Sequence, residues 1–126
     1  MGHKKITSVE MGFSQWTSGV PGRALAGPHP AVNFFEDDAS FHLVVELAGV
    51  LPENVSVTVC DDTLVIRGER PMSLVDTPVG ELRTHSLEID YGPFCREVAI
   101  PDTVEPEAIN ANFSHGLLQI HLPKKR

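Results

Sequence analysis

Short runs in which every second residue is apolar dominate the chain after Pro30. They include 41–47 (FHLVVEL), 55–59 (VSVTV), 63–70 (TLVIRGER) and the final run 117–122 (LLQIHL). This period of two is typical of strands with one buried face. The side chains expected to face inward are Phe41, Leu43, Val45, Leu47, Val55, Val57, Val59, Leu64, Ile66, Phe94, Val98, Ile100, Leu118, Ile120 and Leu122.

Turn residues separate these runs. Asp61-Asp62 predicts a tight hairpin, and His115 next to Gly116 predicts another turn. Residues 102–110 offer at most one helical turn, with Pro106 early in it and Asp102 or Thr103 as a cap. No long amphipathic helix is present in the pattern. Six or seven short strands without a crossover helix predict an all-β, immunoglobulin-like sandwich of two antiparallel sheets over residues 31–125.

The first 30 residues lack such a period. They are rich in Gly, Pro and Ser, which predicts an irregular N-terminal arm. Met11, Phe13 and Trp16 are its main large apolar residues. Two interpretations stay open: a tether that docks on its own domain, or an apolar arm that assembles with other chains or contacts partners.

The segment 71–86 (PMSLVDTPVGELRTHS) is a long connection without a clear pattern. A loop of this length in a compact domain is usually functional or disordered. Its second half, 80–86, is polar but extended in character, so it could form a strand that pairs outside its own sheet.

Length and charge limit the function classes. The 126 residues suffice for one domain with its own core. The net charge is −7, but it is divided unevenly: residues 1–30 hold three basic residues and one acidic residue, and residues 31–126 hold seven basic and sixteen acidic ones. An acidic body argues against nucleic acid as a partner. No apolar run is long enough to span a membrane, so membrane insertion is not expected.

Residues that carry chemistry do not form a recognisable constellation. Cys60 and Cys95 have neither disulfide-scaffold nor metal-site spacing, which favours a reducing cytoplasm. The six His lack zinc-site spacing, and there is no phosphate loop or GxSxG elbow. We therefore expect no catalytic site, no metal and no cofactor, and hence no enzyme.

Three stretches together resemble a known family. Residues 44–70 (VVELAGVLPENVSVTVCDDTLVIRGER), 91–101 (YGPFCREVAIP) and 111–124 (ANFSHGLLQIHLPK) are similar, in order and spacing, to the α-crystallin domain of the small heat-shock proteins. The resemblance covers about residues 31–125. The family's Leu-Pro-Gly is Leu47-Ala48-Gly49 here, which keeps the Gly that can adopt a positive φ. The family's C-terminal Ile-x-Ile tail is missing, and natural absence and truncation both remain open.

The resemblance implies an ATP-independent chaperone, a holdase that binds partly unfolded proteins as a homodimer or small homo-oligomer. It also implies a dimer in which Glu81, Leu82, Arg83 and Thr84 pair with the partner's first strand near Val32 and Phe34. The alternative from another class is a co-chaperone or other non-chaperone sandwich that docks on one defined partner, because a fold does not fix a function.

Two further sites are predicted in the implied sandwich. The runs 55–59 and 117–122 are expected to lie close together at one sheet edge and form an apolar groove for extended segments. Its candidate lining residues are Val55, Val57, Val59, Leu118 and Ile120, and the arm contacts are Met11, Phe13 and Trp16. Arg96 falls at an inward position, so a structural ion pair inside the fold or across the dimer is expected.

Overall fold

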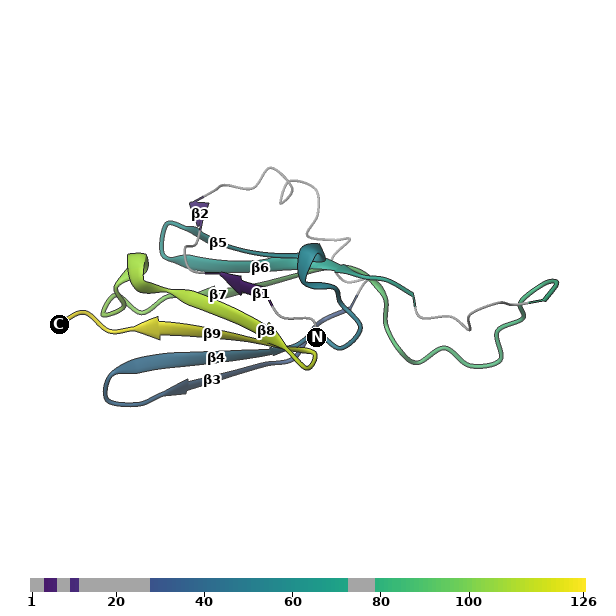
Figure 1. The fold of residues 1–126 in the computed structure, drawn as a ribbon, viewed down its shortest axis with the longest axis horizontal. Coiled ribbons are helices and arrows are strands. Elements are labelled where there is room, and N and C mark those ends of the chain that lie inside the picture. The colour runs from purple at the N-terminus through teal and green to yellow at the C-terminus, as the bar shows by residue number, and fades with distance from the viewer. Residues whose placement is uncertain (1–3, 7–9, 12–27, 73–78) are drawn as a thin grey trace.

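The computed structural model of the chain describes residues 4–6, 10–11, 28–72 and 79–126 (Figure 1). It forms two β-sheets that face each other, as the alternating pattern predicts. The first sheet has the order β1 (Lys4–Ile6), β8 (Asn110–Ser114), β9 (Leu117–Pro123), β4 (Ser40–Glu46) and β3 (Val32–Glu36). The second has the order β2 (Glu10–Met11), β5 (Val55–Cys60), β6 (Thr63–Arg70) and β7 (Gly92–Ala99). The predicted all-β sandwich is confirmed.

The strand register explains why the sheets stack. Antiparallel pairing of β4 with β9 sets Leu43 opposite Ile120, and pairing of β5 with β6 sets Val57 opposite Ile66. Residues directly opposite each other share a face, so apolar side chains from both sheets meet in one layer. The buried core consists of Phe41, Leu43, Val45, Leu47, Val50, Val55, Val57, Val59, Leu64, Ile66, Phe94, Val104, Ile109, Ala111, Phe113, Leu118, Ile120 and Leu122.

Both predicted tight turns are confirmed. Two residues separate β5 from β6, and Asp61 takes a φ of 58° there. His115 and Gly116 join β8 to β9 with φ values of 57° and 77°. A positive φ at both central positions is the geometry of a type I′ hairpin, which matches the twist of the flanking strands. Gly49, the glycine that is kept in Leu47-Ala48-Gly49, has a φ of 81°, the positive value that was expected there.

Two short 3₁₀ turns complete the described fold, η3 (Pro52–Asn54) and η4 (Pro106–Ala108). Pro106 begins η4, as predicted, because proline has the φ of a first helical residue and needs no N–H partner there. The predicted cap at Asp102 or Thr103 is wrong. Glu105 precedes the turn, and its side chain makes no capping hydrogen bond. Within the described ranges no helix has the length and apolar character needed to cross a membrane.

Candidate functional site

Two short strands of the N-terminal arm lie against the edges of the sandwich. β1 pairs antiparallel with β8, with Lys5 opposite Asn112. β2 pairs parallel with β5, with Met11 opposite Val59. The expectation of an irregular arm is therefore wrong at these positions, because exposed strand edges template extended backbone without any sequence period. We call β5 and β8, with the two arm strands on them, the arm side of the sandwich.

The sheet order corrects the predicted groove. β8, not β9, is the edge strand of the sandwich proper, and β9 lies between β8 and β4. Leu118 and Ile120 are thus central core residues, and at most 1% of either side chain is exposed. Val55, Val57 and Val59 do lie on the edge strand β5, but their side chains are also buried in the core. The five residues fill the space between the sheets and do not line an open slot.

Sequence reasoning missed the residues that β8 contributes to this side. Ala111 and Phe113 point into the core from β8, and both are buried. The signal was present, since the two are two positions apart, the period of a strand face, and the His115-Gly116 turn comes soon after. On the arm side, the backbone edges of β5 and β8 therefore lie next to a buried apolar layer. Of the predicted arm contacts, Met11 belongs to β2, and Phe13 and Trp16 lie outside the described residues.

The opposite side of the sandwich is formed by β3 and β7, and we call it the exchange side. β3 is the outer strand of its sheet and pairs only with β4 among the described residues. Phe34 and Phe35 on β3 are 44% and 56% exposed, although the Phe34 ring stacks on Phe41 with 5.7 Å between centroids. Val32 packs partly against the core. An edge strand with exposed aromatic residues is suited to pairing with another chain.

Residues 79–91 extend away from the sandwich, on the right of Figure 1. They form no strand, and all of them are exposed, including Glu81, Leu82, Arg83 and Thr84. Five large apolar residues of this stretch are exposed: Val79, Leu82, Leu87, Ile89 and Tyr91. Pairing of this segment with a partner's β3 stays a prediction.

Arg96 joins the two sheets on the exchange side. Its Nη1 donates a hydrogen bond of 2.6 Å to the carbonyl oxygen of Pro30, two residues before β3 begins. The predicted ion pair inside the fold is not among the ion pairs of the described residues, which join His42 to Asp37, Arg70 to Glu46 and Lys124 to Glu36. A backbone carbonyl takes the role expected of a carboxylate, and Arg96 fixes the path of the chain into β3. An ion pair across a dimer remains a prediction.

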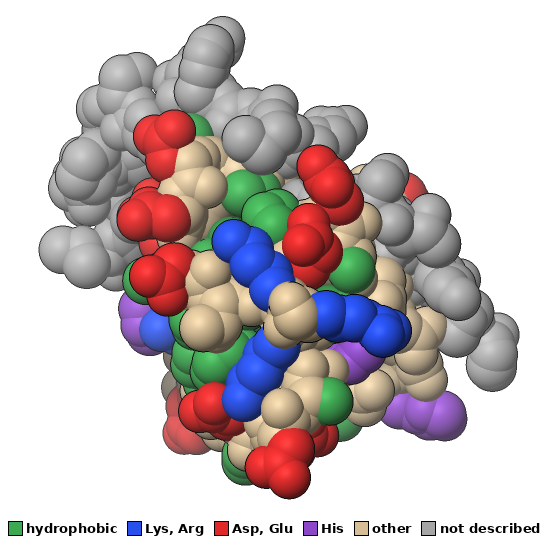
Figure 2. All heavy atoms as spheres, turned by 90° about the vertical axis from the view of Figure 1, so that its left-hand side faces the viewer, with side chains coloured by type: hydrophobic (Ala, Val, Ile, Leu, Met, Phe, Trp, Pro, Cys, Tyr) green, Lys and Arg blue, Asp and Glu red, His purple; other side chains and the backbone are tan. Residues whose placement is uncertain are grey.

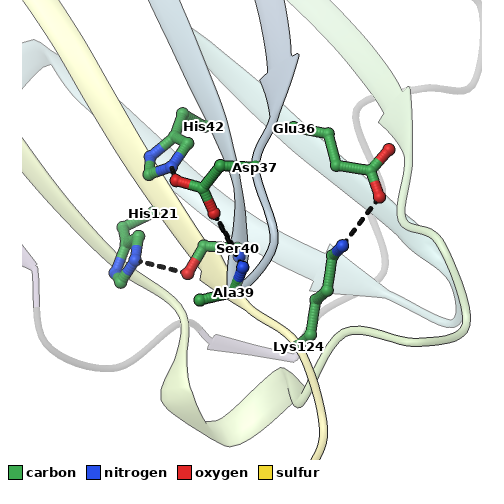
Figure 3. Close-up of polar contacts among 7 residues, drawn as sticks. All are labelled: Glu36, Asp37, Ala39, Ser40, His42, His121 and Lys124. Atoms are coloured by element: carbon green, nitrogen blue, oxygen red, sulfur yellow. Dashed lines mark hydrogen bonds and ion pairs between the residues drawn. The ribbon is translucent and has the colours of Figure 1, made fainter.

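A polar cluster lies at the turn between β3 and β4 (Figure 3). Asp37 Oδ1 accepts hydrogen bonds of 2.8 Å from the backbone amides of Ala39 and Ser40, and Asp37 Oδ2 accepts one of 2.8 Å from His42. The His42 hydrogen bond, aided by the two amides, lowers the pKa of Asp37 from 3.8 to about 2. The carboxylate therefore stays charged down to acid pH and closes the turn.

Two histidines lie side by side on the outer face above this turn. His42 and His121 are direct partners across β4 and β9, and their rings stack with 5.3 Å between centroids. His121 Nε2 also hydrogen-bonds with Ser40 Oγ at 2.9 Å. These contacts hold the β3–β4 turn onto β9. The contacts of both histidines are with side chains of the turn and of each other, so the cluster stabilises the turn and is not arranged as an acid–base pair.

Basic side chains gather at the end of the molecule shown in Figure 2, with acidic side chains around them. Lys124 Nζ lies 2.8 Å from Glu36 Oε2 and 5.3 Å from the centroid of the Phe41 ring. The backbone of Lys125 donates to the Thr103 carbonyl at 2.7 Å. Lys124 and Lys125 are thus held against the sandwich by neighbouring acidic and backbone groups.

The described residues offer little for covalent or metal chemistry. They contain no group of three or more His, Cys, Asp or Glu side chains placed to hold a metal ion. Cys60 and Cys95 are both free thiols. Burial, with a smaller contribution from Glu97, raises the pKa of Cys95, which keeps it in the unreactive thiol form at neutral pH. The arrangement is suited to binding through strand edges and exposed apolar residues.

Comparison with known proteins shows that the chain matches a protein family. Residues 33–126 match the model of the Hsp20/alpha crystallin family. The chain is 34% identical over 96 residues to small heat shock protein C4 of Rickettsia felis, an alignment that covers 76% of this chain and 57% of that protein. It is 30% identical over 97 residues to the probable 15 kDa heat shock protein of Leptospira interrogans, covering 77% and 71%.

Solved structures give the same result. The chain is similar to heat shock protein 16.0 of Schizosaccharomyces pombe, with a TM-score of 0.67, 32% identity, and coverage of 77% of this chain and 87% of that one. The chain is also similar to the small heat-shock protein of Xylella fastidiosa, with a TM-score of 0.67, 32% identity, and coverage of 77% of this chain and 86% of that one. That protein has a distinct high order structure. The chain spans 57% and 60% of the length of the two Rickettsia relatives.

Proposed function

The chain belongs to the Hsp20/alpha-crystallin family, and from that premise we propose that it is an ATP-independent chaperone, a holdase that binds partly unfolded proteins and prevents their aggregation. The observation that carries this proposal is the match over residues 33–126, which includes all of β4 to β9 and all of β3 except its first residue. A holdase needs no nucleotide, because binding of an unfolded chain shifts its folding equilibrium by mass action.

The surface supports this function in two ways. The described body is acidic, which disperses a loaded complex through charge repulsion. Exposed apolar residues lie at Phe34 and Phe35 on the exchange side and along the stretch 79–91, where they could contact apolar segments of a client. Met11, Phe13 and Trp16 of the arm are further candidate contacts.

We further propose that the protein acts as a homodimer in the cytoplasm and that dimers join into small homo-oligomers. In the dimer, Glu81, Leu82, Arg83 and Thr84 of one copy form a strand beside β3 of the other, near Val32 and Phe34. The open outer edge of β3 and the exposed, strandless stretch 79–91 support this pairing. The two free cysteines fit a reducing compartment.

The test is a thermally unfolding enzyme mixed with the protein in the absence of ATP, followed by light scattering. A holdase suppresses the scattering in proportion to its amount. No suppression at several-fold molar excess would overturn the proposal and favour a sandwich that docks on one defined partner.

A further inference from the structure

The two stacked histidines on the outer face of the first sheet have the chemistry of metal ligands. We propose that His42 and His121 form a binding site for a divalent transition-metal ion such as Zn²⁺, which bridges the neighbouring strands β4 and β9. A pair of histidines is smaller than the groups of three or more side chains that the described residues lack, and oxygen ligands complete it. The site does not depend on the chaperone activity proposed above.

The strand register brings the two side chains close together. Leu47 donates a backbone hydrogen bond of 2.7 Å to the Gly116 carbonyl, so these two residues form a hydrogen-bonded pair at the end of the β4–β9 ladder. Hydrogen-bonded and non-hydrogen-bonded pairs alternate along an antiparallel ladder. His42 and His121 lie five positions back and are therefore a non-hydrogen-bonded pair. Pairs of this kind have their Cα atoms only about 4.5 Å apart, with the side chains closer than in the other kind.

The hydrogen bond of His42 leaves the lone pair of its other ring nitrogen available. His42 Nε2 lies 2.8 Å from Asp37 Oδ2. Asp37 has a pKa of about 2, so at neutral pH its carboxylate can only accept a hydrogen bond, and Nε2 carries the proton. In the neutral ring the lone pair is then on Nδ1. A carboxylate that accepts from the far side of a histidine orients the ring and makes it a stronger metal ligand.

His121 can supply the second nitrogen. Its Nε2 lies 2.9 Å from Ser40 Oγ, and a hydroxyl can accept that hydrogen bond, which leaves Nδ1 as the ligand. Two imidazole nitrogens at about 2.0–2.1 Å from one metal ion lie within about 4 Å of each other. The two rings stack with 5.3 Å between centroids (Figure 3), so rotation about their side-chain torsions has to bring the nitrogens together.

A hollow beside the two rings has room for the remaining ligands. Its volume is about 180 Å³, and it is lined by His42, Leu43, Val44, Asn110, Asn112, Gln119, Ile120 and His121. Asn110 is the direct partner of His121 across β8 and β9, so its amide oxygen is the nearest candidate for a third ligand. Asn112 Oδ1 is buried and has no hydrogen-bond partner among the described residues. A water molecule bound to the metal can satisfy this oxygen.

The ligand types select the class of ion. Imidazole nitrogens suit Zn²⁺, Ni²⁺ and Cu²⁺, whereas Ca²⁺ and Mg²⁺ prefer oxygen ligands alone. The bound ion ties β4 to β9 and, through Asp37, to the turn between β3 and β4. Because an unfolded chain does not hold the two histidines together, the ion binds the folded protein preferentially and stabilises it.

The first experiment is a calorimetric titration of the full chain with ZnCl₂ at neutral pH. The variant His42→Phe/His121→Phe keeps two rings on the strands but removes their nitrogens. The matched control, His29→Phe/His85→Phe, changes two exposed histidines elsewhere in the chain. We expect one Zn²⁺ per chain in wild type and control, and an affinity at least about a hundredfold lower in the pair variant. Zn²⁺ should raise the melting temperature of wild type and control but not that of the pair variant.

The second experiment tests the role of Asp37 and keeps both ligands in place. Asp37→Asn should bind Zn²⁺ about tenfold more weakly than wild type, because the carboxylate behind His42 is lost. Asp38→Asn, at the neighbouring position, should bind as wild type does. In ¹⁵N NMR of wild type, Zn²⁺ should shift the Nδ1 resonance of His42 and leave the proton on Nε2.

Three results would overturn the proposal. Equal Zn²⁺ affinity in wild type and the pair variant, or an equal loss in pair variant and control, would mean adventitious binding to surface histidines. One Zn²⁺ per two chains would show that a second copy supplies part of the site. Metal binding at Nε2 of His42, with Asp37→Asn as tight as wild type, would contradict the arrangement with Asp37 behind the ligand.

Discussion

The two sides of the sandwich differ in how the edges of their outer strands are covered. On the arm side, the edges of β8 and β5 are partly covered by short strands of the same chain. On the exchange side, the outer edge of β3 pairs with no other strand of the described residues, and Phe34 and Phe35 are exposed. The stretch 79–91 is exposed as well. Unpaired edges invite pairing with other chains. One side is therefore partly covered from within, and the other is available for a partner.

Truncation of a central core residue should have the largest effect and should show how much the core contributes compared with an exposed position. Leu118→Ala is expected to lower the free energy of unfolding by about 2–5 kcal/mol, because the side chain is fully buried and its loss leaves a cavity. Urea denaturation measures the loss. The matched control is Leu51→Ala, at an exposed leucine, with an expected loss under about 1 kcal/mol. Equal losses in the two variants would mean that Leu118 is not part of the core.

The next largest effect should come from the exchange side. Leu82→Pro/Thr84→Pro removes two backbone donors from the segment proposed to pair with a partner's β3. Both copies of the homodimer carry the change, so four hydrogen bonds are lost, and at about 1 kcal/mol for each the dimer dissociation constant should rise about a thousandfold. Sedimentation velocity across a concentration series measures it.

Leu82→Ala/Thr84→Ala is the control, since it shortens the side chains but keeps both N–H groups. If the proline and alanine variants weaken the dimer equally, side-chain contacts and not strand pairing hold it. A wild-type protein that is monomeric at all concentrations would contradict the exchange.

Arg96 tests the link between the sheets on the exchange side. Arg96→Ala removes the hydrogen bond to the Pro30 carbonyl and should lower the free energy of unfolding by about 1–2 kcal/mol. Arg96→Lys keeps the charge and should recover part of this loss. If the alanine variant is as stable as wild type but dissociates more readily, Arg96 acts across the dimer and not within the chain.

The smallest effect should come from Asp37, whose side chain is more than half exposed. Its folded pKa of about 2 lies below the ordinary 3.8, so its stabilising contribution is complete above about pH 4 and is lost as the pH falls toward 2. Wild type should exceed Asp37→Asn in stability at pH 6, and the difference should vanish near pH 2. Asp38→Asn, at the neighbouring carboxylate, is the control. A difference that persists at pH 2 would assign the effect to the side chain's shape and not to its charge.

The sequence predicted the strands and their inward faces well, because alternation reports burial directly. Phe41, Leu43 and Val45 on β4 and Leu64 and Ile66 on β6 all lie in the core as expected. Both hairpin turns were also predictable, since Asp61 and Gly116 occupy positions where few residues accept a positive φ.

The lateral order of the strands was not predictable in the same way. Alternation shows that Leu118 faces inward, but it does not show whether β9 lies at an edge or in the middle of its sheet. That depends on pairing between strands far apart in the sequence, such as β4 with β9. β1 and β2 were missed for a related reason. Strands of three and two residues have no measurable period, and they form because an existing edge holds them.

The most direct test of the contrast between the two sides is a light-scattering assay without ATP, in which wild type is compared with Lys5→Pro/Ile6→Pro and with its control Ala24→Pro/Ala26→Pro. If the arm covers edges that can receive an unfolding client, the Lys5→Pro/Ile6→Pro variant should suppress aggregation at a lower molar ratio than either of the other two proteins. Suppression at the same or a higher ratio would contradict a closed arm side.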